Sequence, residues 1–368
     1  METRIREEEA MVRFERCEEE ASFLSPLRDY GVDVQRIEAR IDPLTGFVSF
    51  VRRGRQFWAG MYRTDEEVLR RLAKETEANC VFCPQRIDKS TPKFLPEFIE
   101  EGRVKRGEAT LFPNLFPHKA CSAIVVVTES HFLRLKEFSE KMLFDAFMLA
   151  DYFVRRAYEL KGLEYAEIGA NFLYTSGSSI VHPHIQVILS KVPYTLIKLY
   201  EEKGRSFYER EGVSFWHALI GKERELKERF IGEIGSVVFY TPFAPVREDE
   251  VDGVVKGKSN FLEFSEDDWM DIAKGISRVL HAYDDKGLSA FNYALFSGPL
   301  GKESPHLLSG LKIVSRSSVQ TYPVSETWFA NCLLFEGLAV EPPEDVASYM
   351  KSYLLPLKGR PEKEAYYY

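Results

Sequence analysis

The stretch Ser176–Gln186, which reads SGSSIVHPHIQ, places two of the chain's seven histidines two residues apart, directly after a serine–glycine turn. The next three residues, VIL, are apolar and mostly β-branched, which predicts a strand. On a strand, His182, His184 and Gln186 project from one face with about 7 Å between successive members. Two imidazoles and a carboxamide beside such a turn indicate a site that handles phosphate. The alternative is a half-buried strand whose polar side happens to carry histidines.

An internal repeat surrounds this stretch. Two blocks recur at an offset of about 125 residues: EFSE at 137–140 and 263–266, and YxxKGL at 158–163 and 283–288. Each copy of EFSE opens a predicted helix, which is followed by a strand, a glycine-containing loop and another strand. We therefore expect two related α+β halves, each a strand–helix–strand–strand unit.

The repeat sets the expected division of the chain. We expect an N-terminal extension over 1–35, a first half over 36–191, a helical connection over 192–228 and a second half over 229–368. Aligning the halves places His184 opposite Gly310 and Gln186 opposite Lys312. The second copy keeps the strand pattern and loses both histidines, so the first half is expected to carry the chemistry.

Local patterns predict further elements. Residues 1–35 are charge-rich with weak helical periodicity, and a strand-like segment covers 40–51. A helix is expected over about 65–76. A stronger amphipathic helix is expected over 139–160, because Ser139 is a good N-cap and Gly162 lies just past its end, where helices stop.

Composition and charge narrow the class of protein. The 368 residues are 45% hydrophobic and 29% charged, which is ordinary for a globular chain with one large core or two domains. A formal net charge of −8 argues against a nucleic-acid backbone as the main partner. No apolar run approaches the ~20 residues that span a bilayer, and the N-terminus does not resemble a secretory signal. We expect a cytoplasmic enzyme with no nucleic-acid or membrane partner.

Phosphate chemistry explains the residue types in the histidine stretch. The SGSS turn at 176–179 offers hydroxyls and backbone N–H groups, a concavity that holds an anion, and Asn171 on the preceding strand can add an amide donor. A neutral His184 can attack phosphorus once a backbone carbonyl fixes its tautomer. Gln186 can donate to a phosphate oxygen but cannot protonate a leaving group. It therefore favours leaving groups such as phosphates, and transfer over hydrolysis.

The cysteines indicate a metal site. The chain has five, an odd number that does not suggest a disulfide framework, and Cys80 and Cys83 form a CxxC pair. Two imidazoles would complete a tetrahedral Cys2His2 site for structural zinc, with His118, His131 and His182 as candidates. The alternative is two free buried cysteines.

Together these motifs resemble the galactose-1-phosphate uridylyltransferase-like family, in the nucleotidyltransferase branch of the histidine-triad superfamily. The resemblance rests on the CxxC pair, a histidine before a helix and the GxSxxHPHxQ strand, and it runs from DPLTG at 42–46 to the end of the chain. It implies an α+β, duplicated histidine-triad-like fold: two antiparallel-sheet halves with helices packed on them.

The resemblance also implies roles for single residues. His184 matches the nucleophile that carries a nucleoside monophosphate, and Gln186 matches the glutamine that binds the phosphate. The ligands of one structural zinc ion per chain are then Cys80, Cys83, His131 and His182. The resemblance also implies that Arg55, Phe112, Asn114, Phe116, Asn171, Gly177 and Ser179 bind substrate or phosphate. The hydroxyls of the SGSS turn add Ser178 to this expected set.

Three departures from the family pattern bear on specificity. The family's Asn-Asp-Phe at the nucleoside reads NLF at 114–116, so a contact expected for uridine is missing. Its second-half His-x-His, part of an iron site in some members, reads GLK at 310–312, so we expect no iron. Its sugar-binding loop aligns with WFANCLL at 328–334. The chemistry is expected to survive these changes, whereas galactose specificity is not implied.

The leading hypothesis is a ping-pong transfer of a nucleoside monophosphate from a nucleotide-sugar of the UDP-glucose type to a sugar 1-phosphate or inorganic phosphate. An alternative within this chemistry is a phosphorylase acting on ADP-glucose, a dinucleoside polyphosphate or adenylyl sulfate. Two other classes stay open: a triad-type nucleotide hydrolase, against which Gln186 argues, and an inactive zinc-stabilised nucleotide-binding protein. A homodimer is expected; the sequence does not determine the base, the sugar or the acceptor.

Overall fold

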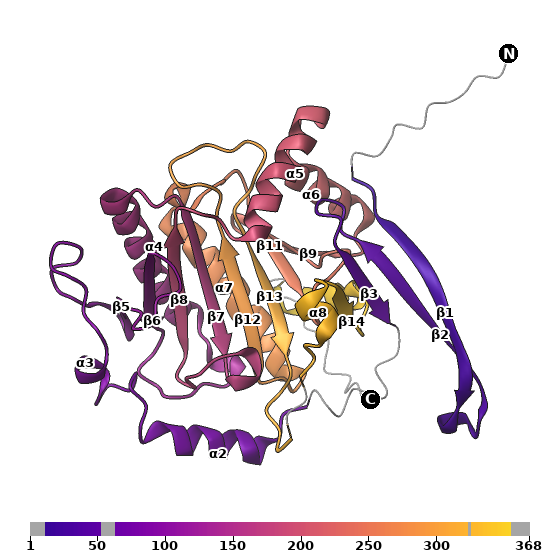
Figure 1. Cartoon of the computed structure of the whole chain (residues 1–368), viewed down its shortest axis with the longest axis horizontal. Helices are drawn as coiled ribbons and strands as arrows, with labels where there is room; N and C mark the ends of the chain where they lie inside the picture. The colour runs from indigo at the N-terminus through magenta and orange to yellow at the C-terminus, as the bar shows by residue number, and fades with distance from the viewer. Residues whose placement is uncertain (1–11, 53–62, 323–324, 355–368) are drawn as a thin grey trace.

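A computed structural model describes residues 12–52, 63–322 and 325–354 of the chain. Its main element is a ten-stranded sheet in which every neighbouring pair is antiparallel (Figure 1). In order across the sheet, the strands are β4 (Val104–Arg106), β5 (Ala109–Pro113), β6 (Cys121–Val126), β8 (His184–Ser190), β7 (Tyr165–Phe172), β12 (Ala290–Phe296), β13 (Gly310–Arg316), β11 (Val251–Val255), β10 (Val237–Tyr240) and β9 (Phe230–Ile234).

The sheet consists of two five-stranded halves with the same internal order. From the outer edge to the centre, the first half runs β4-β5-β6-β8-β7 and the second runs β9-β10-β11-β13-β12. The halves join through the β7–β12 pair, in which Asn171 lies opposite Asn292. β8 begins at His184 and β13 at Gly310, the two residues that the sequence repeat places opposite each other. The expected duplicated α+β fold is therefore confirmed.

The repeated EFSE blocks are helix starts. Each lies at a short 3-10 turn, η2 (Leu135–Glu137) or η4 (Phe261–Glu263), which leads into α4 (Glu140–Lys161) or α7 (Glu266–Asp285). The hydroxyls of Ser139 and Ser265 accept hydrogen bonds from the first turn of these helices. Gly162 ends α4 in the left-handed region, at φ 59°. The helix expected over 139–160 is confirmed.

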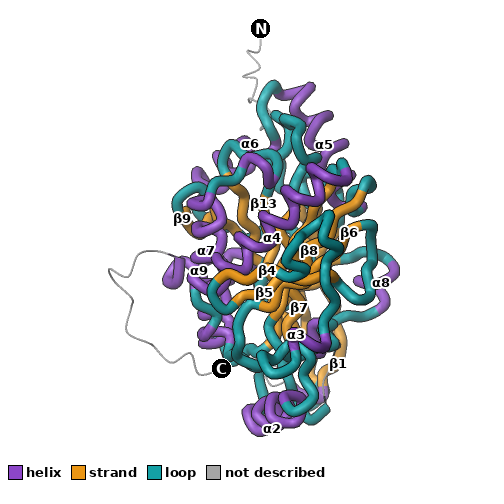
Figure 2. Tube along the Cα trace, turned by 90° about the vertical axis from the view of Figure 1, so that its left-hand side faces the viewer, coloured by secondary structure: helices purple, strands orange, loops and turns teal. Residues whose placement is uncertain are grey.

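Helices cover one face of the sheet and leave part of the other open. Buried side chains of α4 and α7, among them Phe147, Phe153 and Trp269, form the main core with the sheet, and α9 (Pro343–Leu354) joins it. Figure 2 shows α7 and α9 on one side of the strands and the short helix α8 (Phe329–Leu333) on the other. The opposite face of the second half packs against α5 (Thr195–Glu211) and α6 (Phe215–Leu226). The open part of this face lies over β7 and β8, where every second residue is only half-buried.

A smaller sheet contains β1 (Glu15–Ser25), β2 (Gly31–Ile41), β3 (Val48–Arg52) and β14 (Gly337–Ala339). In the described part of the segment 1–35, the weak helical periodicity does not correspond to a helix, because β1 pairs with β2 over its whole length around the turn η1 (Pro26–Arg28). The expected boundary at residue 35 falls inside β2, and the division of the chain into segments stays a prediction. The strand-like segment 40–51 is interrupted by a turn that Asp42 stabilises through the backbone N–H groups of Leu44 and Thr45.

The remaining helices are α2 (Glu66–Glu77) and α3 (Ile87–Ser90). α2 confirms the helix expected over about 65–76, and the Asp65 carboxylate caps it through the N–H groups of Glu67 and Val68. Among the helices in the described part of the chain, none is long and apolar enough to cross a bilayer.

Candidate active site and metal site

The four residues that match the family's zinc ligands lie together. Cys80, Cys83, His131 and His182 are all buried, and their ligand atoms lie within 4.8 Å of one another. The group joins the loop after α2, the loop after β6 and the residue two before β8. His118, the other candidate histidine, is exposed and lies outside the group.

The distances within the group fit a tetrahedral ion. Nδ1 of His182 lies 3.6 Å from Sγ of both Cys80 and Cys83, and Nδ1 of His131 lies 3.5 Å from Sγ of Cys83. Bond lengths of about 2.3 Å to sulfur and about 2.0–2.1 Å to nitrogen give a tetrahedral S–N edge of about 3.5 Å. The donor set and its spacing therefore suit a metal ion of the zinc type.

Hydrogen bonds orient both imidazoles for such an ion. Nε2 of His182 lies 2.8 Å from the Thr128 carbonyl, and Nε2 of His131 lies 2.9 Å from the Thr76 hydroxyl. A ring that donates from Nε2 presents its Nδ1 lone pair to the cysteines. In most protein metal sites, the ring nitrogen that does not bind the metal donates a hydrogen bond in this way. Burial and the neighbouring Cys80 raise the pKa of Cys83 to about 12. This thiol therefore ionises to a metal-binding thiolate only when a cation lies nearby.

The surroundings of His184 favour a neutral ring with one free nitrogen. Its Nδ1 lies 2.8 Å from the backbone carbonyl of His182, so Nδ1 carries the proton and Nε2 carries the lone pair. Burial lowers the pKa of His184, which favours the uncharged ring. The Phe82 ring, from inside the CxxC loop, meets this imidazole edge-on, with centroids 5.3 Å apart at 72°. His184 therefore packs directly against the loop that carries the two cysteines.

Gln186 lies next to His184 on the open face of the sheet. Both are half-buried and alternate with the buried Ile185 and Val187. Gln186 lies opposite Gly169 of β7, where a side chain would meet the Tyr293 carbonyl at 3.2 Å. The floor beside Gln186 is therefore bare backbone, and no described residue bonds to its carboxamide. His182 departs from the expected alternation, because it precedes β8 and is fully buried in the metal group.

The SGSS turn has only part of the expected donor set. The hydroxyls of Ser176 and Ser178 donate to backbone carbonyls within the turn, at 2.7 Å each. Gly177 adopts φ 91°, and the buried Leu173 before it adopts φ 67°, a strained value for a residue with a side chain. Ser179 and Gly177 are exposed. Two serines thus fix the shape of the turn, and Ser179 with the backbone stays accessible to an anion.

The expected nucleoside segment lies at the edge of the same face. Phe112 on β5 is buried and contacts Phe82, with ring centroids 5.4 Å apart. Asn114 accepts a hydrogen bond from the Phe116 N–H at 3.0 Å, and Phe116 is exposed. The expected phosphate contact Arg55 lies outside the described residues.

The second half has no room for a histidine at the equivalent position. A side chain at Gly310 would lie 2.5 Å from the Gly253 carbonyl. Lys312, opposite Gln186 in the repeat, forms ion pairs at 2.7 Å with Glu250 and with Asp252. This half therefore contains an internal ion-pair cluster where the first half has His184 and Gln186.

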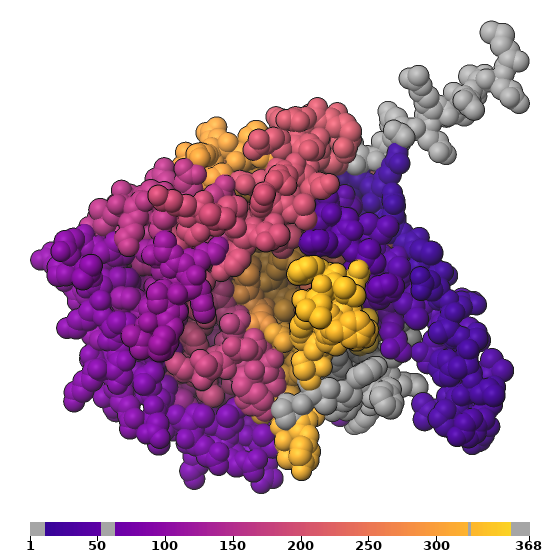
Figure 3. Space-filling model, viewed as in Figure 1, coloured from indigo at the N-terminus to yellow at the C-terminus, as the bar shows by residue number. Residues whose placement is uncertain are grey.

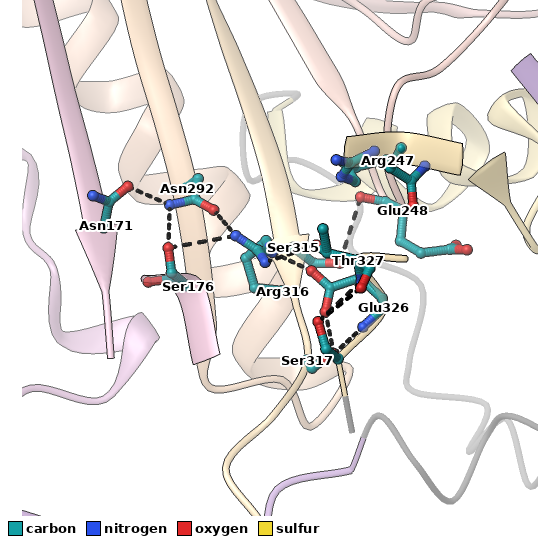
Figure 4. Close-up of polar contacts among 12 residues, drawn as sticks. Asn171, Ser176, Arg247, Glu248, Asn292, Ser315, Arg316, Ser317, Glu326 and Thr327 are labelled. Carbon is teal, nitrogen blue, oxygen red and sulfur yellow. Dashed lines mark hydrogen bonds and ion pairs between the residues drawn. The ribbon is translucent and has the colours of Figure 1, made fainter. Parts of the chain in front are cut away.

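Sequence reasoning missed three residues of the site. Phe82 contacts His184, and Asn292 and Arg316 reach the SGSS turn from the second half, with Asn171 beside them (Figure 4). The position of Phe82 inside the CxxC motif is a sequence feature that could have identified it. Asn292 and Arg316 had none, because they reach the site only through the β7–β12 and β12–β13 pairing.

Solved structures share this fold. An ADP-glucose phosphorylase from Arabidopsis thaliana, with bound ADP-glucose, aligns with a TM-score of 0.68 and 17% identity over 87% of this chain and 99% of that one. A GalT-like protein from the same plant gives 0.66 and 17% over 86% and 99%, and a uridylyltransferase gives 0.64 and 17% over 86% and 97%. The chain therefore has the fold of galactose-1-phosphate uridylyltransferase-like proteins, as the resemblance implied.

A curated relative has a higher sequence identity to the chain. An uncharacterized protein of Archaeoglobus fulgidus is 32% identical over 321 residues, which make up 87% of this chain and 93% of that one. The chain belongs to one family with this archaeal protein. No model of a known protein family matches the chain.

Proposed function

We propose that the protein is a nucleotidyltransferase that forms a covalent nucleotidyl intermediate on His184. The observation that carries this proposal is the 2.8 Å contact from His184 Nδ1 to the His182 carbonyl, which leaves Nε2 as the free nucleophilic atom. Gln186 on the same face and the SGSS turn supply neutral donors for the phosphate that is attacked.

The reaction has two displacements. In the first, Nε2 attacks the α-phosphorus of the donor; the N–P bond forms, the bond to the bridging oxygen breaks, and the leaving phosphate keeps the electron pair. In the second, a phosphate oxygen of the acceptor attacks the same phosphorus and releases Nε2. Gln186 stabilises the charge on the phosphoryl oxygens in both steps. Neither step needs a protonated leaving group, which suits a glutamine at this place.

We propose a nucleotide-sugar as donor and a sugar 1-phosphate or inorganic phosphate as acceptor. The fold shared with an ADP-glucose phosphorylase and with uridylyltransferases supports this choice of class. ADP-glucose, a dinucleoside polyphosphate or adenylyl sulfate with phosphate as acceptor is the alternative within the same chemistry. We also propose a homodimer in the cytoplasm.

For the metal group we propose one structural zinc ion. Four protein ligands would fill its coordination sphere, so the ion would stabilise the loops and leave no position for substrate. Through Phe82 and the His182 backbone, the same loops position His184. The chain's residues thus link metal binding to the orientation of the nucleophile.

The test is a donor screen read by intact mass. The protein is incubated with UDP-glucose, ADP-glucose, GDP-sugars and diadenosine polyphosphates, with His184→Ala as control. The expected result is the mass of one nucleoside monophosphate added to the wild type alone. No adduct with any donor, or an adduct that persists in His184→Ala, overturns the proposal. Release of free nucleoside monophosphate that added acceptor does not change would identify the hydrolase instead.

A further inference from the structure

A hydrogen-bonded row of side chains crosses the seam between the halves and ends at the phosphate turn. It contains Asn171 of β7, Asn292 of β12 and Arg316 of β13, which lie on three neighbouring strands (Figure 4). Nδ2 of Asn292 lies 2.5 Å from Oδ1 of Asn171 and 3.1 Å from the Ser176 carbonyl. Arg316 Nη1 donates to Oδ1 of Asn292 and lies 3.4 Å from the Ser176 carbonyl.

The far end of the row is fixed by a buried carboxylate. Glu326 accepts hydrogen bonds from Nε of Arg316 and from the Ser317 hydroxyl, and the Thr327 hydroxyl lies 3.3 Å from Nη2 of Arg316. The Arg316 side chain is only 16% exposed and that of Glu326 only 8%. A guanidinium held in this way has few alternative positions.

The chemistry of the groups sets the direction of every bond in the row. A guanidinium can only donate, so the Asn292 atom that it contacts must be the oxygen. The other Asn292 atom is then the NH2 group, and the Asn171 atom that accepts from it must be an oxygen. The remaining atom of Asn171 is therefore its NH2 group, and Figure 4 shows it on the side away from Asn292.

That side of Asn171 is the side of the nucleophile. β8 is the next strand there. The last pair of its antiparallel register with β7 is Gln186 with Gly169, and extending this register by two residues places His184 opposite Asn171. No described residue accepts a hydrogen bond from Nδ2 of Asn171. Figure 3 shows a hollow on this face of the molecule, with strands of the second half at its floor.

We propose that Asn292 and Arg316 are positioning residues of the transfer reaction: they fix the amide of Asn171 with its NH2 group toward the phosphate that His184 attacks. The inference rests on the proposed function and extends it, because it makes the second half a working part of the active site. The row also makes the NH2 group of Asn171 a stronger donor, since each amide is polarised by the donor behind it.

Asn292→Asp is the sharpest variant. A carboxylate keeps the shape and strengthens the contact with Arg316, but it cannot donate to Asn171 or to the Ser176 carbonyl. Asn260→Asp is the control, because Asn260 is even more buried than the half-buried Asn292 and its amide donates to Glu263 and to the Lys302 carbonyl, neither of which belongs to the site. We expect Asn292→Asp to slow adduct formation in single turnover by about 10- to 100-fold with little change in donor affinity.

A double-mutant cycle distinguishes positioning from a general structural effect. If Asn292 acts through Asn171, then Asn292→Asp adds no further loss to Asn171→Ala, whereas independent effects multiply. A wild-type rate in Asn292→Asp, a multiplied loss in the double variant, or an equal loss in Asn260→Asp overturns the proposal. If the wild type forms no adduct, the proposed function fails, and the positioning claim is then decided by NMR. The side-chain amide signal of Asn171, identified by its loss in Asn171→Ala, is expected to shift in Asn292→Asp and not in Asn260→Asp; an unshifted signal refutes the claim.

Discussion

Removing one cysteine of the metal group should destabilise the fold far more than removing another buried cysteine. Cys83→Ser leaves three buried groups, those of Cys80, His131 and His182, without the cation that the set is arranged to bind. Each buried polar group without its partner costs about 1–3 kcal/mol, so we expect a loss of about 3–9 kcal/mol for the three groups. That is a large share of the total stability of a domain, which is typically 5–15 kcal/mol. The midpoint of thermal unfolding should fall by roughly 4–12 °C.

The assay combines thermal unfolding with metal analysis of the purified protein. Cys121→Ser is the matched control, since Cys121 is buried on β6 and lies outside the metal group. We expect about one zinc per chain in the wild type and in Cys121→Ser, and much less in Cys83→Ser. A wild type with no bound metal and full stability, or a Cys83→Ser variant that unfolds at the temperature of Cys121→Ser, would refute the reasoning.

Three further predictions concern the scaffold. Gly275→Ala on α7 places a methyl 2.0 Å from the buried Phe239 ring, so it should lower the free energy of unfolding, measured with denaturant, by about 1–3 kcal/mol. Gly221→Ala on α6 has nothing within 4 Å and should raise that free energy by up to about 1 kcal/mol. Burial raises the pKa of Glu167 to about 7, so the wild type should lose stability, on the order of 1–3 kcal/mol, as the pH rises from about 4.5 to 7. Glu167→Gln should remove that loss. Equal pH dependence of stability in both proteins would contradict this. Lys312→Met should leave Glu250 and Asp252 without their cation and cost about 3–5 kcal/mol, measured by the same unfolding experiment.

The elements that sequence predicts well here are those encoded locally. Ser139 and Gly162 mark the ends of α4 because capping depends on a few neighbouring residues. The repeat places His184 over Gly310, and both residues begin their strands in the structure. The CxxC spacing likewise predicts a metal site, and its two cysteines lie together with His131 and His182. The nucleophile that the HPH strand predicts stays a prediction. The choice of His131 over His118, however, came from the family resemblance.

The structural features that the sequence does not predict depend on long-range pairing or on the direction of side chains. The glutamate-rich segment of β1 has a composition that favours helix, and its pairing with β2 overrides that preference. The hydroxyls of Ser176 and Ser178 could face a ligand or the backbone, and only the folded turn shows that they bond to the backbone. Arg316 is distant from Ser176 in the chain, and sheet pairing brings them together.

The most direct test of the central claim is to locate the covalent intermediate on the peptide. After incubation with the donor that gives an adduct, the protein is digested and the fragment spanning residues 162–191 is sequenced by mass spectrometry. We predict one nucleoside monophosphate on His184, lost when an acceptor phosphate is added before digestion. A modification on any other residue, or a fully turned-over donor with His184 never modified, would contradict the account.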